Sequence, residues 1–447
     1  MQHPLPASLF HVDALSLLMI GLVAFIGLSV AGFASRYLAG DCARPRFFLL
    51  LGSLAASVMV LVSADHLLLL LAAWALSNLL LVLLMVHKPG WRAARAAGAL
   101  AGRNFLTGAL LVAAGFALLF VASGETSIQA IVHAPMDSAV AHAALALLLL
   151  GAMTQSAAWP FHRWLTSSLN SPTPVSAFMH AGLVNGGGYL LARFAPLYLE
   201  APGLLTVMLV AGLVTALVGT AWKLMQHDVK RMLACSTMGQ MGFMLLQCGL
   251  GLFPAAVAHL MWHGLFKASL FLGSGGAAAE KRIVPDRPPR MGTFAAALLC
   301  GALASYGFAF ASHKDWLAAD ATLVLVAVAF IAGAQFALAL LRGRALAMLP
   351  VALPASGVMG LAYGASVYLV EAVLAPAGLM RPMPLDAFHL SAIVLLFSAW
   401  LAVLFLRRPG APGRTPGWVL RLYVKAFNAS QPHPATVTAQ RTHYQHL

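Results

Sequence analysis

The chain has 447 residues, of which 61% are hydrophobic and only 9% are charged. Soluble domains carry about 25% charged residues, and a soluble fold could not bury this much apolar surface. The composition therefore excludes a soluble globular protein. Apolar runs of about 20 residues recur along the chain, which is the length at which a helix crosses a bilayer. We predict an all-α, polytopic membrane protein.

Thirteen apolar runs predict thirteen transmembrane spans. Their limits are 11–35, 47–63, 67–86, 101–122, 141–170, 175–197, 203–225, 232–252, 254–275, 291–315, 320–341, 345–370 and 387–406. Two spans contain residues that interrupt a helix or an apolar run: Pro160 in the fifth, and His313 with Lys314 and Asp315 in the tenth. Broken helices at membrane depth line protein or a water-filled cavity, and they often mark transport sites. We predict that both spans are broken helices.

The net charge is +14, and the basic residues lie mainly in loops that follow odd-numbered spans. Loops after the first, third, seventh, ninth, eleventh and thirteenth spans carry Lys and Arg, whereas the others are nearly bare. Basic loops stay on the cytoplasmic side of a membrane. This pattern predicts an N-terminus outside and a C-terminus in the cytoplasm. The first run lacks a positively charged n-region, so we expect it to remain as a span rather than a cleaved signal.

The chain divides into a transmembrane domain over residues 1–406 and a basic cytoplasmic tail over residues 407–447. In the tail, RRPGAPGRTPG is typical of a linker and GWVLRLYVKAF of a short basic amphipathic segment, and the rest is predicted to be disordered. The tail is interpreted either as a solvated extension or as a docking segment for a partner.

Three ionisable side chains, His259, His263 and Lys267, lie inside the apolar ninth span. Their spacing of four residues places them on one stripe of a helix. Ionisable groups at membrane depth are costly and usually line a proton or ion path. The alternative is that the histidines bond to backbone carbonyls and that Lys267 reaches the membrane surface. A zinc site is disfavoured, because HLMWH lacks the glutamate of HExxH.

Further ionisable candidates lie on other spans. Lys314 and Asp315 could form a buried ion pair that holds or releases a proton, or an ordinary pair at a loop edge. His180 could extend the path, or it could be a core histidine with its hydrogen bonds satisfied. Lys223 and His313 are weaker candidates, and Lys223 is also placed to reach the inner membrane surface.

Enzyme motifs are absent from the sequence. The four cysteines form no CxxC pair, and neither a phosphate loop, a GxSxG motif nor a dinucleotide fingerprint is present. We therefore expect a transporter subunit rather than an enzyme, with no metal and no cofactor.

Three long segments resemble the antiporter-like family of proton-translocating membrane subunits, found in respiratory complex I and Mrp antiporters. They are WPFHRWLTSSLNSPTPVSAFMHAGLVNGGGYLLAR, HDVKRMLACSTMGQMGFMLLQCGLG and HLMWHGLFKASLFLGSG. QMGFMLLQCGLG and HAGLVNGGGYLLARFAP are most similar to DabB, the membrane subunit of the DAB inorganic-carbon accumulation complex. The resemblance implies a bacterial inner-membrane protein that passes protons or another cation. It also implies a partner, the soluble zinc-containing, carbonic-anhydrase-like subunit DabA, at the cytoplasmic face.

The resemblance assigns roles to ionisable positions. His180, His259, His263, Lys267 and Lys314 match positions of the family's proton path, and Asp315 matches the acidic neighbour of its last lysine. Two positions depart from the family: Ala75 stands in place of a glutamate, and Gln155 in place of its partner lysine. Loss of both is coherent, because one charge buried alone would cost several kcal/mol.

Three functions remain open. The first is a cation conduit, for protons above all, that powers CO2 hydration by the soluble partner. The second is a subunit of a respiratory complex or of a Na⁺/H⁺ antiporter, which the missing Glu and Lys disfavour. The third is a non-conducting membrane anchor for a soluble enzyme.

Overall fold

Apolar α-helices make up most of the chain in the computed structural model, which describes residues 9–134, 138–278, 288–317, 319–341, 347–405 and 416–437. The helices are α1 (Ala14–Tyr37), α2 (Arg44–Ser63), α3 (Leu67–Met85), α4 (Arg92–Ser123), α5 (Ile128–His133), α6 (Ala139–Gln155), α7 (Arg163–Thr166), α8 (Thr173–Ala181), α9 (Gly186–Arg193), α10 (Ala195–Leu199), α11 (Pro202–Met225), α12 (Val229–Gly249), α13 (Phe253–Leu272), α14 (Met291–Ala311), α15 (Thr322–Leu340), α16 (Leu349–Leu374), α17 (Ala387–Phe405) and α18 (Gly417–Ala429). Short 3-10 segments are η1 (Leu183–Asn185), η2 (Gly273–Ala278), η3 (Ala375–Ala377) and η4 (Pro434–Thr436).

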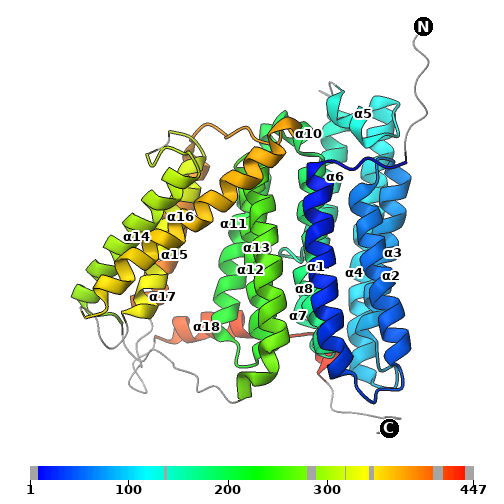
Figure 1. The fold of residues 1–447 in the computed structure, drawn as a ribbon, viewed down its shortest axis with the longest axis horizontal. Helices are drawn as coiled ribbons and strands as arrows, with labels where there is room; N and C mark the ends of the chain where they lie inside the picture. The colour runs from blue at the N-terminus through cyan, green and yellow to red at the C-terminus, as the bar shows by residue number, and fades with distance from the viewer. Residues whose placement is uncertain are drawn as a thin grey trace. The chain divides into compact units, whose positions relative to one another are not determined.

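The helices form two compact units (Figure 1). Unit 1 comprises residues 1–246, 259–280 and 425–447, so it contains α1 to α11 and most of α12 and α13. Unit 2 comprises residues 247–258 and 281–424, and contains the start of α13, α14 to α17 and the first two turns of α18.

Among the described residues, ten helices are long and apolar enough to cross a membrane. They are α1 to α4, α11 and α13 to α17. Their bounds lie within four residues of the predicted limits, except that α4 begins nine residues earlier than predicted. Large apolar side chains on them, such as Leu28 and Val121, are exposed in the isolated chain, as lipid-facing residues are. The all-α, multi-span prediction is confirmed, whereas the count of thirteen is not: α6 is shorter, the sixth predicted span is divided, and α12 is less apolar.

Of the two predicted helix breaks, the structure contains the one in the fifth span but not the one in the tenth. In the fifth span the helix ends at Gln155 and resumes at Arg163, so the break around Pro160 is present. The tenth span is instead one continuous helix to Ala311, and the predicted break coincides with its end. His313 terminates it because its φ of 53° is incompatible with a right-handed helix. The sixth span contains a second interruption, at η1, which the apolar pattern of the sequence does not predict.

Small residues set the closest helix contacts, as they do in membrane proteins generally. In unit 1, a Cβ added at Gly242 of α12 would lie 2.4 Å from the backbone nitrogen of Ala216 in α11. In unit 2, a Cβ at Gly360 of α16 would lie 2.0 Å from the carbonyl oxygen of Ala304 in α14. Larger residues at these two positions would separate the helices.

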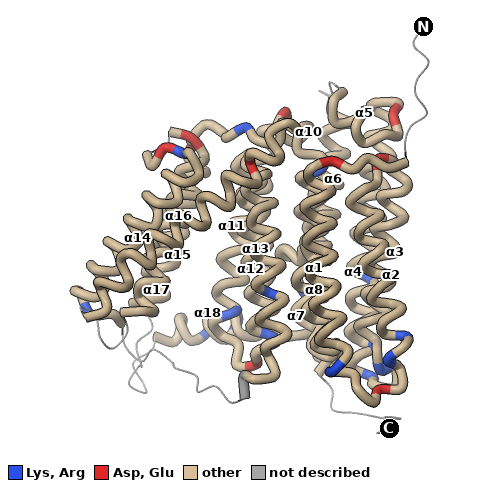
Figure 2. The backbone as a smooth tube through the Cα atoms, in the orientation of Figure 1, with Lys and Arg blue, Asp and Glu red and all other residues tan. Residues whose placement is uncertain are grey.

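The loops at one end of the unit 1 helices are basic (Figure 2). Arg36 lies in the last turn of α1, Arg44 opens α2, and Lys88 lies between α3 and α4. Asp41 joins two of these loops, because its carboxylate lies 3.1 Å from Nε2 of His87 and 3.8 Å from Nζ of Lys88. The opposite end is capped by acidic residues, since Asp65 accepts hydrogen bonds from Ser127 Oγ and from the backbone of Gln129 in α5.

A buried arginine holds the broken sixth span to the start of the chain. Arg193, at the end of α9, donates two hydrogen bonds to Asp13 (2.6 and 3.1 Å) and one each to Ser16 and Tyr189. Asp13 also caps α1 by accepting from the backbone nitrogen of Ser16. Burial alone would raise the pKa of the Asp13 carboxyl, but Arg193 outweighs it and holds that pKa below its ordinary 3.8.

Asp13→Asn is therefore expected to lower the free energy of unfolding by about 1.5–3 kcal/mol at neutral pH, the value of a hydrogen bond to a charged group. Because the pKa is lowered in the fold, this contribution is complete above about pH 5 and is lost as pH falls through the lowered pKa. Unfolding of both proteins in detergent as a function of pH measures it. A difference between them that does not change with pH would contradict the assignment.

The end of the chain folds back onto unit 1. Asn170 donates to the carbonyl of Thr436, and Ser167 Oγ accepts from the backbone nitrogen of His433. Gln226 donates to Ser430 Oγ, and Arg231 donates to Gln431. The prediction of disorder after Phe427 is therefore wrong for residues 428–437, because their polar groups find partners in loops 166–171 and 226–231. Residues 438–447 lie outside the described part of the chain.

Candidate functional site

The three ionisable residues of α13 are buried together in unit 1. Lys267 is 0% exposed, and His259 and His263 are also buried. The imidazole rings of the two histidines stack with their centroids 6.0 Å apart, as expected for residues one helical turn apart. Gly264 allows this helix to approach α8 closely, since a Cβ there would lie 2.8 Å from the carbonyl oxygen of Ala181. The predicted stripe therefore lies inside the unit rather than on its lipid-facing surface.

His180 of α8 belongs to the same cluster. It is 1% exposed, and its ring stacks on Phe271 of α13 at a centroid distance of 4.3 Å. Its Nδ1 lies 3.0 Å from the hydroxyl of Thr237 on α12, and that hydroxyl donates to the carbonyl of Leu233. We therefore assign the Nδ1–H tautomer, in which Nε2 of His180 carries the lone pair of the neutral ring.

The α13 histidines are oriented in a similar way. His259 donates to a backbone carbonyl at Gln240, and His263 to one at His180. Nε2 of each ring makes no hydrogen bond to any described protein group, so the bonded nitrogen is Nδ1. The backbone contacts expected for structural histidines are thus present at one nitrogen, whereas the other presents a basic lone pair. A side chain with one fixed and one free nitrogen can receive and pass on a proton.

Lys267 differs from an ordinary buried lysine. Its Nζ makes no hydrogen bond to any described protein atom, and no carboxylate among the described residues pairs with it. A buried ammonium without a counter-ion is disfavoured, so this group favours exchange between charged and neutral forms. The alternative in which Lys267 reaches the membrane surface does not fit its burial. Lys223, by contrast, is exposed on the last turn of α11, as a lysine at a membrane surface is.

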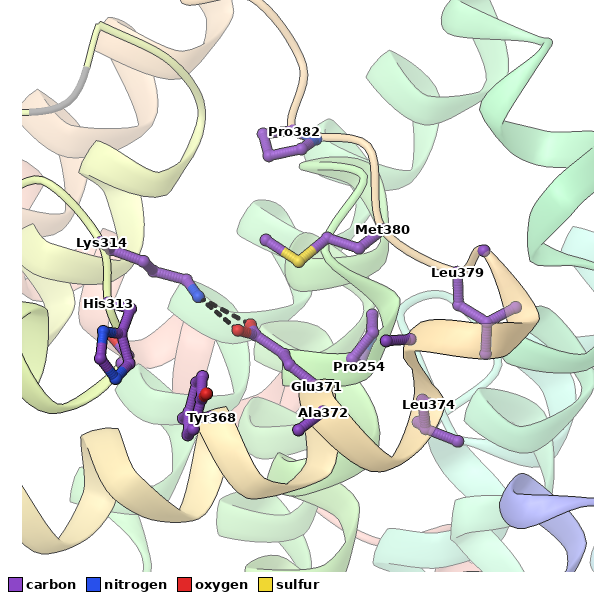
Figure 3. Close-up of a pocket in the computed structure, with 13 residues that line it drawn as sticks. Pro254, His313, Lys314, Tyr368, Glu371, Ala372, Leu374, Leu379, Met380 and Pro382 are labelled. Carbon is purple, nitrogen blue, oxygen red and sulfur yellow. Dashed lines mark hydrogen bonds and ion pairs between the residues drawn. The ribbon is translucent and has the colours of Figure 1, made fainter.

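A second cluster of ionisable residues lines a cavity of about 540 Å³ in unit 2 (Figure 3). Nζ of Lys314 lies 2.7 Å from both carboxylate oxygens of Glu371 on α16. The side chains are 5% and 12% exposed, respectively. His313 packs on the ring of Tyr368 at 4.5 Å, and all four residues line the cavity. The ion pair thus lies at the wall of an open pocket whose other lining residues are mostly apolar.

The predicted ion pair between Lys314 and Asp315 is wrong. Asp315 is exposed, and the ammonium of Lys314 is directed to Glu371 instead. The two residues do not pair because they are consecutive in a turn, where the side chains of neighbouring residues point different ways. Glu371 was missed because it lies 57 residues from Lys314 and only the packing of α16 brings the two together.

Two neutral amide side chains form a third buried polar pair, in unit 1. Asn78 of α3 and Gln155 of α6 exchange two hydrogen bonds, of 3.1 and 3.0 Å, and both side chains are buried. Gln155 also donates to the carbonyl of Leu183 in η1. Ala75 lies on an exposed face of α3, so the residue that meets Gln155 is Asn78. The pair joins α3, α6 and the interruption of the sixth span without carrying a charge.

Asn78→Ala is expected to lower the free energy of unfolding by about 1–3 kcal/mol, since one side of a buried amide pair loses its partner. The double variant Asn78→Leu/Gln155→Leu is expected to cost less than the sum of its single changes, with a coupling of about 0.6–1.7 kcal/mol. Unfolding in detergent of the wild type, the two single leucine variants and the double variant measures this cycle. Additive effects of the two changes would show that the amides do not stabilise one another.

Known proteins resemble the chain along most of its length. The family model described as "NADH:quinone oxidoreductase/Mrp antiporter, TM" matches residues 64–287, and "NADH-Ubiquinone oxidoreductase (complex I), chain 5 N-terminus" matches residues 7–48. In sequence, the chain is 32% identical over 430 residues to "Probable inorganic carbon transporter subunit DabB2" of Halothiobacillus neapolitanus, covering 94% of the chain and 77% of that protein.

Other relatives match over shorter regions. DabB1 of Halothiobacillus neapolitanus is 42% identical over 62% of the chain and 52% of its own length. NADH-quinone oxidoreductase subunit L of Pseudomonas aeruginosa is 38% identical over 59% of the chain and 44% of its own length. The chain thus spans about half the length of several curated relatives that it matches.

A solved structure of an Mrp complex from Dietzia sp. has the same fold, with a TM-score of 0.57, 24% identity and coverage of 94% of this chain and 48% of that one. Two family models, a relative matched along most of both chains and this fold agree with one another. The chain therefore belongs to the family of antiporter-like membrane subunits that includes those of NADH:quinone oxidoreductases and Mrp antiporters.

Proposed function

We propose that this chain conducts a cation, protons above all, as the membrane subunit of an inorganic-carbon accumulation complex. The observation that carries the proposal is Lys267, which is fully buried, has no hydrogen-bond partner at Nζ among the described residues and lies one turn from His263. A purely structural lysine would have a counter-ion, because an uncompensated buried charge is strongly destabilising. The free Nε2 atoms of His259 and His263 supply acceptors on the same stripe.

The proposed path comprises His180, His259, His263 and Lys267 in unit 1 and Lys314 with Glu371 in unit 2. His313 lines the cavity beside that pair, whereas Asp315 and Lys223 are exposed and contribute to the surface charge. The neutral pair Asn78–Gln155 supports a simplified conduit over a full charge relay, because it can hold a hydrogen bond but cannot take up a proton near neutral pH.

The proposed orientation places the basic loops of unit 1 in the cytoplasm of a bacterium and the complex in its inner membrane. The partner proposed at that face is a soluble, zinc-containing subunit of the DabA type, which would hydrate CO2 to bicarbonate. Proton entry through the membrane subunit would make this hydration effectively one-way. The names of the DabB relatives support the carbon substrate, and the segment 430–437 on the basic end of unit 1 is proposed as part of the docking surface.

The experiment that tests the proposal is complementation of a bacterial host that lacks carbonic anhydrase and grows only at raised CO2. The chain together with its soluble partner is expected to restore growth in air, and neither protein alone is expected to do so. A protonophore should remove the restored growth advantage. Rescue that persists when proton entry is blocked would favour a non-conducting anchor, and sodium-dependent rescue would favour an antiporter subunit.

A further inference from the structure

Helix α18 exposes an unusually apolar surface for a segment outside the membrane spans. It has 13 residues, which is too short to cross a bilayer. Trp418 is 65% exposed and Leu422 is 62% exposed, and Leu420, Tyr423 and Val424 are also exposed. Arg421, Lys425 and Asn428 are spaced four and three residues apart, so they share one polar stripe of the helix. The remaining surface of α18 is apolar.

The position of α18 relative to the membrane follows from its attachment. The last turn of α18 and the segment after it belong to unit 1. Ser430 and Thr436 of that segment are buried, and the segment is hydrogen-bonded to Ser167, Asn170 and Gln226. Gln226 follows α11 directly, so this attachment lies where a membrane-spanning helix ends. The last turn of α18 is therefore held near the level at which a bilayer meets water.

The charged residues of the sequence that contains α18 have one sign. From Arg407 to the end of the chain there are several arginines and a lysine but no aspartate or glutamate. A cationic stripe beside an exposed apolar face is complementary to anionic lipid, since headgroups attract Lys and Arg while acyl chains cover the apolar side chains. Trp and Tyr, both present here, are enriched at this interface.

We propose that α18 is an interfacial helix that lies in the headgroup layer of an anionic membrane. Leu420, Leu422 and Tyr423 contact the acyl chains, whereas Arg421 and Lys425 contact lipid phosphates. Exposed apolar patches of this kind are otherwise rare on proteins in water. The anchor fixes the carboxyl-terminal segment at the basic end of unit 1, and it does so whether or not the chain conducts a cation.

Site-directed labelling of the full chain in phosphatidylcholine–phosphatidylglycerol vesicles tests this inference. A Cys42→Ser background removes the exposed cysteine, and the other three native cysteines are buried. A fluorophore is attached to Leu422→Cys on the apolar face or to Asn428→Cys on the polar stripe, both of which are exposed helical positions. The first label is expected to be quenched by a nitroxide on the lipid, and the second by aqueous iodide.

Two results would overturn the inference. Equal quenching of both labels by iodide would show that α18 lies in water, and protection of the Leu422→Cys label from both quenchers would show that protein covers it. The charge contribution is tested separately with Arg421→Glu/Lys425→Glu in the same Leu422→Cys background. Lipid quenching is expected to decrease in anionic vesicles and to change little in pure phosphatidylcholine, whereas no decrease in anionic vesicles would contradict the role of the lipid charge.

Discussion

Replacing Lys267 with alanine is expected to abolish growth in air of the complemented host without loss of the membrane subunit or of its partner. The side chain is fully buried and offers a titratable group in a region where a charge otherwise finds no solvation. Removing it is expected to reduce cation conduction at least about a hundredfold, which corresponds to about 2.7 kcal/mol added to the barrier. Growth measured at low and at raised CO2 separates this loss from a general defect.

Lys223→Ala provides a matched control for Lys267→Ala. Both residues are lysines in transmembrane helices of unit 1, but Lys223 is exposed and Lys267 is buried. The control is expected to retain most of the activity. Wild-type growth of the Lys267→Ala strain, with wild-type protein levels, would remove Lys267 from the path.

Breaking the ion pair of Lys314 and Glu371 is expected to have the second large effect. Lys314→Met or Glu371→Gln alone leaves a largely buried partner without its counter-charge, which costs about 3–5 kcal/mol in buried pairs. Both variants are expected to unfold at lower temperature in detergent and to conduct poorly. The exchanged variant Lys314→Glu/Glu371→Lys is expected to recover much of the stability, because the ion pair is formed again in reverse.

The activity of the exchanged variant distinguishes two roles for this pair. Recovery of stability without recovery of conduction would mean that the lysine is needed at its own position. Recovery of both would mean that the ion pair only holds α16 beside the end of α14. Asp315→Asn serves as the control, since this neighbour is exposed, Lys314 pairs with Glu371 instead, and the variant is expected to behave as wild type. A large loss in that variant would contradict the assignment of Glu371 as the partner of Lys314.

The spans and the buried row on α13 could be predicted because both depend on local patterns. A run such as Pro202–Met225 is apolar along its whole length, and lipid permits no other regular structure that satisfies its backbone. The spacing of His259, His263 and Lys267 fixes their common stripe in any helix. The interruption of the sixth span could not be predicted, because no proline marks the region of η1.

The pairings could not be predicted, because they depend on which helix faces meet. Asn78 and Gln155 lie 77 residues apart, and nothing local to either residue identifies the other. Glu371 sits in an apolar run that resembles any other span until packing places it beside Lys314. Sequence adjacency was misleading for Asp315, since consecutive residues in a turn need not point to one place. Prediction of such contacts requires the tertiary arrangement.

Proton flux in proteoliposomes is the measurement that tests cation conduction by this chain most directly. Vesicles that contain a pH-sensitive dye and the purified chain, with and without its soluble partner, are given an inward proton gradient at clamped membrane potential. Wild-type protein is expected to acidify the lumen faster than Lys267→Ala protein, and replacing the proton gradient with a sodium gradient identifies the cation. Flux equal to that of Lys267→Ala vesicles and of protein-free vesicles, in the presence of the partner, would contradict the proposed conduit.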